Sequence, residues 1–72
     1  MQTKTISALE MLRDRLASGH YQLGERLPSE RSLCAELGIS RSGLRKILSR
    51  LEAEDLVWRH VGKGTFAGPR PA

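Results

Sequence analysis

One short stretch of the chain, residues 40–50, combines basic side chains and serines in a pattern suited to binding a polyanion. The basic residues are Arg41, Arg45, Lys46 and Arg50, and the serines are Ser40, Ser42 and Ser49. A guanidinium can bridge the two acceptors on the major-groove edge of guanine, and cationic and hydroxyl groups both bind phosphate oxygens. The stretch contains no acidic residue, so its chemistry indicates contact with nucleic acid.

The same stretch predicts a helix whose polar face carries these groups. At about 100° per residue, apolar side chains recur at i, i+3, i+4 and i+7 and form one stripe. The stripe consists of Leu44, Ile47, Leu48 and Leu51. Ser40 is placed to cap the N-terminus, and Ile39 can pack on Leu44 as a hydrophobic staple. We therefore predict a helix over residues 40–54 with a buried apolar stripe and an exposed basic face.

Each polar residue of this helix has a DNA-binding interpretation and a simpler structural one. Arg45 is the first choice for base readout, with a solvated surface arginine as the alternative. Arg41 can read a base or bind a phosphate, and Lys46 can bind a phosphate or remain solvated. For Ser40 the capping role is favoured over DNA contact, and for Ser49 both interpretations stay open.

Two basic residues outside this helix are also candidates for DNA contact. Arg31, near the start of a second predicted helix, either reaches DNA or pairs with a nearby acid such as Glu30 or Glu36. Lys63 follows Gly62 at the tip of a predicted hairpin, where a lysine has little role in a core. DNA contact is therefore the favoured interpretation of Lys63.

Length and charge distribution narrow the class of protein. A chain of 72 residues forms one small domain with a modest core. The formal net charge is +4; residues 1–37 hold five basic and five acidic residues, whereas residues 38–72 hold seven basic and three acidic. The whole excess lies in and after the basic helix, as a nucleic-acid interface requires. Solubility alone is the simpler explanation of such a charge.

The sequence holds no residue set suited to catalysis, a metal or a cofactor. His20 and His60 lack a partner acid or nucleophile at a useful spacing, and Cys34 is the single cysteine. The Gly-x-Gly at residues 62–64 follows a predicted strand but opens no helix, so it is no nucleotide-binding loop. We therefore expect a binding protein without cofactor or metal, and not an enzyme.

Two further helices are expected to support the basic one. The first spans residues 5–18 and ends at Gly19 in the left-handed conformation. Residues 20–27 then form a connection with a short extended piece. The second helix opens at Ser29, its N-cap, and stops at Gly38. Only Gly38, Ile39 and the capping Ser40 separate it from the first turn of the basic helix, a spacing typical of a helix-turn-helix. The expected core residues of these segments are Ile6, Leu9, Met11, Leu12, Leu16, Tyr21, Leu23, Leu27, Leu33, Cys34 and Leu37.

A β-hairpin is predicted after the basic helix. Residues 56–61 and 64–67 form its two short strands, and Trp58 packs rather than stacks on bases. Gly62 and Lys63 suit a two-residue type II′ turn between the strands. The predicted fold class is mainly α with a small β-hairpin, a winged helix-turn-helix of three helices plus a two-stranded wing.

Three motifs occur in a specific combination along the chain. They are Leu-Pro-Ser-Glu-Arg at residues 27–31, Leu-Gly-Ile-Ser-Arg at residues 37–41 and Gly-Lys-Gly-Thr-Phe at residues 62–66. Each alone is weak, but together they resemble the DNA-binding domain of the GntR family of bacterial transcription regulators, over residues 6–67. We expect the FadR-like type of this family.

This resemblance implies a role for each part of the wing and the basic helix. In the family, the helix that corresponds to residues 40–54 enters the major groove, and the wing tip, residues 62–64, reaches the neighbouring minor groove. The family's DNA-contacting residues match Arg31, Arg41, Arg45 and Gly62. The full set of residues expected to contact DNA is Arg31, Ser40, Arg41, Ser42, Gly43, Arg45, Lys46, Ser49, Gly62 and Lys63.

Two residues depart from the family pattern. Gly43 stands where many members carry proline or threonine; a glycine there lets a backbone or phosphate approach, or is simply tolerated in the helix. Asp55 replaces a common glycine at the end of the basic helix. Aspartate tolerates the left-handed region better than most residues, so the helix can still end there.

The resemblance also implies partners. Family members usually carry a C-terminal effector-binding and dimerising domain, so residues 1–67 are expected to form the DNA-binding domain and residues 68–72 a linker or tail toward it. A homodimer would read a palindromic operator. The expected location is the bacterial cytoplasm, at the nucleoid, without a membrane partner. The alternative is a winged-helix module for an acidic protein partner, although the basic helix lacks the aromatic anchors of protein interfaces.

Overall fold

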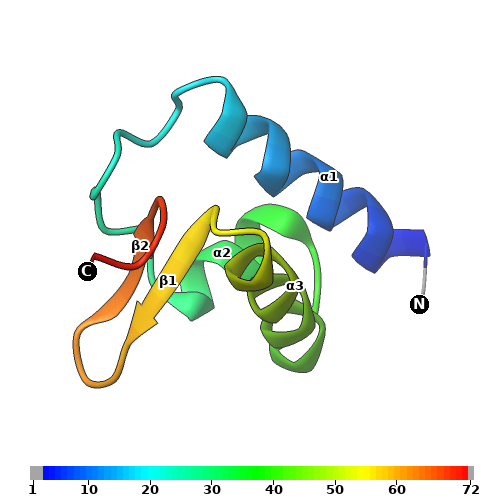
Figure 1. Ribbon diagram of the computed structural model, residues 1–72. Coiled ribbons are helices and arrows are strands. Elements are labelled where there is room, and N and C mark those ends of the chain that lie inside the picture. Colours follow the sequence, from blue (N-terminus) through cyan, green and yellow to red (C-terminus); the bar gives the residue numbers. More distant parts are fainter. Residues whose placement is uncertain (1–2, 72) are drawn as a thin grey trace.

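The protein is a three-helix unit with a β-hairpin attached to its last helix (Figure 1). The computed structural model describes residues 3–71, with side chains from residue 6 onward. Its elements are α1 (Thr3–Ala17), α2 (Glu30–Leu37), α3 (Arg41–Ala53), β1 (Val57–His60) and β2 (Gly64–Ala67). This architecture confirms the predicted fold class. None of the described helices has the length and apolar composition needed to cross a membrane.

Helix α3 has the caps that the sequence predicts. The Ser40 hydroxyl accepts a hydrogen bond from the Gly43 amide at 3.2 Å. At the other end, Asp55 has a φ of 61°, so an aspartate occupies the left-handed position that usually selects glycine. The Leu56 amide donates to the Leu51 carbonyl across this turn at 3.0 Å. The predicted helix, with its caps, is confirmed.

A tight turn joins α2 to α3. Ser29 caps α2 by accepting from the Ser32 amide at 3.2 Å. Gly38 ends α2 with a φ of 68°, and its amide donates to the Cys34 carbonyl at 2.8 Å. Only residues 38–40 separate the two helices, so the helix-turn-helix is confirmed.

The core lies between the three helices and the inner face of the hairpin. It contains Ala8, Leu9, Leu12, Tyr21, Leu27, Leu33, Leu37, Leu44, Ile47, Leu48, Leu51, Val57 and Ala67. Leu16 and Cys34 pack against it from partly buried positions, as does Ile39, which supports its role in the staple. The four residues of the α3 stripe are fully enclosed, so that stripe fixes which face of α3 remains outside.

Three predicted core residues are exposed instead. Ile6 and Met11 lie roughly 110° on either side of the centre of the α1 stripe, so the packing of α1 leaves both at its margins. Ala8, which is not among the predicted core residues, is buried in their place. Leu23 is 82% exposed, because it sits in the turn before Gly24 and lies over the backbone of Gly68 rather than in the core.

The hairpin is antiparallel, with Trp58 opposite Phe66 and Arg59 opposite Thr65. The predicted type II′ turn is wrong. The Lys63 amide donates to the His60 carbonyl at 2.9 Å, and Gly62 has a φ of 81° at the third position of this turn, as a type II turn requires. Three residues therefore connect the strands, because the pairing ends one residue earlier than expected.

The predicted extended piece before α2 forms part of the sheet. Arg26 makes an isolated bridge with Phe66, and the Leu27 amide donates to the Thr65 carbonyl at 2.8 Å. The Ala67 amide in turn donates to the Glu25 carbonyl at 2.8 Å. This piece covers the outer edge of β2, whereas β1 carries the other edge of the sheet.

Candidate nucleic-acid interface

Helix α3 exposes the polar face that its sequence predicts. Because its apolar stripe is fully buried, the opposite side chains point to solvent. Gly43 is half-buried in the first turn, where its amide also completes the cap. The exposed residues of this face are Arg41, Ser42, Arg45, Lys46, Ser49 and Arg50.

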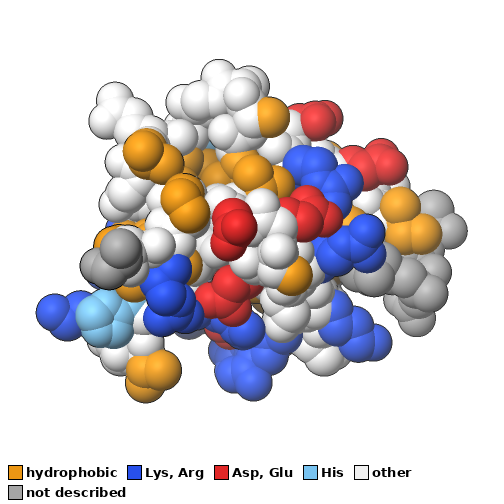
Figure 2. Space-filling model, viewed as in Figure 1, with side chains coloured by type: hydrophobic (Ala, Val, Ile, Leu, Met, Phe, Trp, Pro, Cys, Tyr) orange, Lys and Arg blue, Asp and Glu red, His pale blue; other side chains and the backbone are white. Residues whose placement is uncertain are grey.

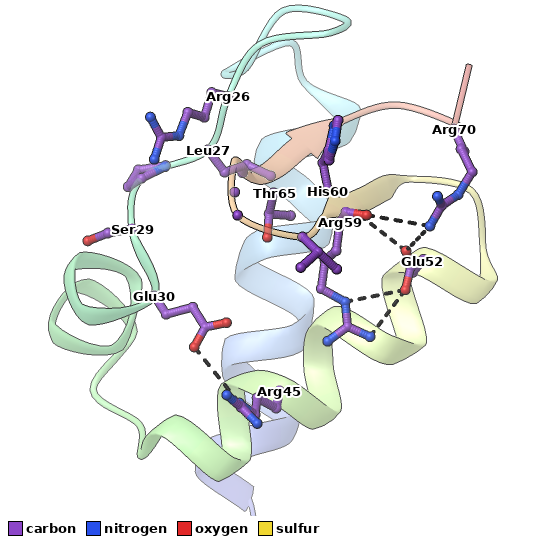
Figure 3. A pocket seen from close by; sticks show the side chains of 14 residues that line it. Arg26, Leu27, Ser29, Glu30, Arg45, Glu52, Arg59, His60, Thr65 and Arg70 are labelled. Carbon is purple, nitrogen blue, oxygen red and sulfur yellow. Dashed lines mark hydrogen bonds and ion pairs between the residues drawn. The ribbon is translucent and has the colours of Figure 1, made fainter. Parts of the chain in front are cut away.

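Arg45 is only loosely paired. Its Nε atom lies 3.9 Å from the Glu30 carboxylate of α2, and 66% of its side chain is exposed. Figure 3 shows the two side chains facing each other across the space between α2 and α3. An exposed pair at this distance contributes little stability, so the guanidinium is free to move to another acceptor.

The predicted acid partners of Arg31 are engaged elsewhere. Glu30 faces Arg45, and Glu36 accepts a hydrogen bond from Arg15 of α1 at 2.9 Å. Within the part of the chain that the structure describes, no carboxylate lies within 4 Å of the cationic groups of Arg31, Arg41, Lys46 or Lys63. Arg50 differs, because Glu54 holds its Nε at 3.0 Å.

The wing tip projects from the molecule beside α3 (Figure 1). Gly62 and Lys63 are both exposed there. Val61, just before them, is 97% exposed, more than any other large hydrophobic side chain that the structure describes. The hydrogen bond from the Lys63 amide to the His60 carbonyl closes the turn at this tip.

A groove separates the wing from α3 and the start of α2. Arg26, Arg45, Arg59 and Arg70 line it together with Glu30 and Glu52. Three of these arginines were not predicted as site residues: Arg26, Arg59 and Arg70. Arg59 was detectable from the sequence, because it follows buried Val57 by two residues and so faces α3 from the strand. Arg26 and Arg70 are brought to the groove by residues distant in sequence, because Arg26 pairs with Phe66 and Arg70 binds Glu52.

Glu52 is the polar centre of this groove. Its carboxylate accepts from the Arg59 backbone amide at 3.1 Å, from the Arg59 guanidinium at 3.2 and 3.3 Å, and from Arg70 at 3.3 Å (Figure 3). Arg59 also reaches the Ser49 hydroxyl at 3.4 Å. These contacts, led by the backbone hydrogen bond, hold the pKa of Glu52 below its usual value.

Basic and acidic side chains lie on different parts of the surface. Figure 2 shows Lys and Arg side chains along the lower edge of the molecule, over α3 and the wing, with most visible acidic side chains above them. Basic side chains therefore predominate along this edge, with a hydrophobic and a His side chain among them at its lower left. Among the residues that the structure describes, no three His, Cys, Asp or Glu side chains gather in a way that could hold a metal ion.

A helix-turn-helix whose last helix exposes a basic face, flanked by a projecting hairpin, defines the chain as a winged helix-turn-helix DNA-binding domain. The family comparison is specific. Residues 5–67 match the family described as bacterial regulatory proteins, gntR family, and the chain belongs to that family.

Curated relatives are transcriptional repressors. A probable fructoselysine utilization operon transcriptional repressor of Escherichia coli is 42% identical over 57 residues, which cover 79% of this chain and 24% of that protein. The repressor NagR of Bacillus subtilis is 41% identical over 58 residues, covering 81% and 24% respectively. The chain thus spans about a quarter of the length of the curated relatives that it matches.

Solved structures share the fold. The DNA-binding domain of AraR in complex with its operator ORE1 has a TM-score of 0.86 at 26% identity, over 94% of this chain and 83% of that one. A putative GntR regulator from Rhodococcus sp. RHA1 has a TM-score of 0.83 at 28% identity, over 99% and 33%. The AraR domain was solved on DNA, which makes its fold directly relevant to the basic edge described above.

Proposed function

We propose that this domain is the sequence-reading part of a bacterial transcription repressor and binds double-stranded DNA. Helix α3, within the predicted range 40–54, enters the major groove, and the wing tip, residues 62–64, reaches the adjacent minor groove. The observation that carries the proposal is the exposed face of α3 over residues 41–50, which contains no acidic residue, beside an exposed, basic wing tip. The operator complexes of the AraR domain support the same use of this fold.

Specific roles follow from exposure and pairing. Arg45 and Arg41 read bases, because both are exposed and neither is held by a close carboxylate. The DNA phosphates, or base edges at the floor of a DNA groove, are bound by Arg31, Lys46 and Lys63. The remaining contacts come from short residues that let the backbones approach DNA: Ser40, Ser42, Gly43, Ser49 and Gly62.

The parent protein is proposed to act as a homodimer. Two copies of residues 1–67, joined through residues 68–72 to a C-terminal effector-binding and dimerising domain, would read a palindromic operator in the bacterial cytoplasm. The domain acts by binding rather than by catalysis, which agrees with relatives that are regulators. The FadR-like subtype stays a prediction, and the sequence of the full-length parent would test it.

A selection from a randomised duplex pool tests this function. The purified domain is incubated with the pool at two salt concentrations, and the retained DNA is sequenced. Enrichment of one short half-site, with an affinity that falls steeply as salt rises, is the expected result. Binding without sequence enrichment would contradict base readout, and no binding at low salt would favour the protein-contact module instead.

A further inference from the structure

One carboxylate joins the α3 helix to the wing. Glu52 lies in the last turn of α3 and accepts hydrogen bonds from the backbone and the side chain of Arg59 in β1. The same carboxylate accepts from Arg70, which follows β2. Arg70 also donates to the Arg59 carbonyl at 3.5 Å. Both sides of the hairpin are therefore tied to one residue of α3.

The position of this link matters because β1 is an edge strand. In the described part of the chain the sheet has the order β1–β2, so β1 has a neighbouring strand on one side only. The Arg59 amide points to the other side, away from β2 and toward Glu52. An unpaired edge is free to bend or rotate, whereas the carboxylate fixes it to the helix. The angle between wing and helix decides whether both reach DNA at once, and a preset angle lowers the entropy lost on binding.

We propose that Glu52 is a positioning residue for DNA binding: it holds the wing at the angle at which the tip and the outer face of α3 contact DNA together. This inference rests on the proposed function. It assigns a binding role to an acidic residue on an otherwise basic edge, where an acid repels phosphates.

The proposal predicts a change of affinity opposite in sign to simple electrostatics. Removal of an acid beside a DNA-binding surface adds one unit of positive charge and should strengthen binding. It would also release two arginines, Arg59 and Arg70, toward the phosphates. If Glu52 positions the wing, its removal weakens binding despite both effects.

Glu54 provides a matched control two residues further along. It also binds two arginines, Arg13 at 2.7 Å and Arg50 at 3.0 Å, but both lie on helices and neither belongs to the wing. Glu52→Ala and Glu54→Ala change the net charge equally. Glu52→Gln has the same charge change but keeps a carbonyl acceptor for the Arg59 amide, so it should restore part of the affinity.

The first measurement is a titration of the selected half-site duplex by fluorescence anisotropy, with each variant checked for folding by circular dichroism. Glu52→Ala should weaken binding by roughly threefold to tenfold, Glu52→Gln by less, and Glu54→Ala not at all. In a Lys63→Ala background, which already lacks the wing-tip contact, Glu52→Ala should cause little further loss. Equal affinities for Glu52→Ala and Glu54→Ala, or a full additional loss in the Lys63→Ala background, would overturn the proposal.

The second measurement needs no DNA, so it separates failure of this proposal from failure of the proposed function. Backbone NMR order parameters of residues 61–63 and hydrogen exchange of the Arg59 amide are recorded for the wild type, Glu52→Ala and Glu54→Ala. Glu52→Ala should lower the order parameters and speed the exchange, and Glu54→Ala should leave both unchanged. An unaltered wing in Glu52→Ala would refute the positioning role even if the wild-type domain binds DNA well.

Discussion

Single side chains of the basic edge differ in how firmly the protein holds them. Arg50 and Arg59 are engaged by Glu54 and Glu52 at close range, whereas Arg45 has a distant partner. An arginine that is already paired must break that pair to reach DNA. The loosely held residues are therefore the ones whose removal should affect sequence reading.

Arg45→Ala should weaken binding to the selected half-site by about 1–3 kcal/mol and relax the preference at one base position. The reason is the loss of a bidentate contact to a base edge. Anisotropy titrations against the half-site and its single-base variants measure both effects. Arg50→Ala is the matched control, and an equal loss of base preference in that variant would contradict the assignment.

Lys63→Ala should act differently, because a lysine at the wing tip contributes charge rather than base-edge hydrogen bonds. We expect weaker binding to all duplexes by a similar factor. The plot of log affinity against log salt should also become shallower, its negative slope losing about one in magnitude. Titrations at four salt concentrations with the half-site and a scrambled duplex give both quantities. A loss confined to the half-site would show that Lys63 reads sequence.

At the scale of elements, helix ends are set by local residues, and so the sequence predicted them well. Ser29 and Ser40 cap the helices that follow them, and Gly38 and Asp55 end helices in the left-handed conformation. At the end of α3, an aspartate occupies a left-handed position that favours glycine. This conformation stores a small amount of backbone strain.

Asp55→Gly should therefore stabilise the domain. A residue with a side chain in the left-handed region costs roughly 1–2 kcal/mol, less for aspartate, and glycine avoids this cost. We expect a gain of about 0.5–1 kcal/mol in the free energy of unfolding, measured by urea denaturation. Asp55→Ala is the opposing control and should destabilise; a gain from alanine would show that φ is not the cause.

Contacts between distant segments were harder to predict. The bridge from Arg26 to Phe66 and the carboxylate link from Glu52 to Arg59 depend on the packing of the hairpin against the helices. No local pattern identifies these partners, although strand alternation places Arg59 on the same side of β1 as the buried Val57. The turn type was wrong for the same reason, because strand pairing and not the tip residues decided where the turn began.

At the scale of the whole molecule, two carboxylates add surface links between elements that already pack around one core. Glu54 links α1 to the end of α3 through Arg13, and Glu52 links the wing to α3. Hydrogen bonds from arginines lower the pKa of both groups; the backbone amide of Arg59 contributes most for Glu52, and the side chain of Arg50 contributes most for Glu54. Their ionised forms are therefore favoured in the folded state.

Stability should consequently fall in acid. Each glutamate contributes fully above its unfolded pKa of about 4.3, and the contribution is lost as the pH falls through the lower folded pKa. Urea midpoints should be constant between pH 6 and pH 7 and decrease below about pH 4.5. The double variant Glu52→Gln and Glu54→Gln should show a shallower decrease, and an unchanged slope would assign the acid sensitivity to other groups.

The placement of Trp58 gives the wing an optical signature of its own. It is the single tryptophan in the chain, and it lies on β1 with its ring stacked on Phe66 at 4.8 Å. The tryptophan fluorescence of this protein therefore comes from the hairpin, because the three helices contain no tryptophan. A stopped-flow experiment that records indole emission together with a label on the duplex would time the arrival of the wing separately from the encounter with DNA.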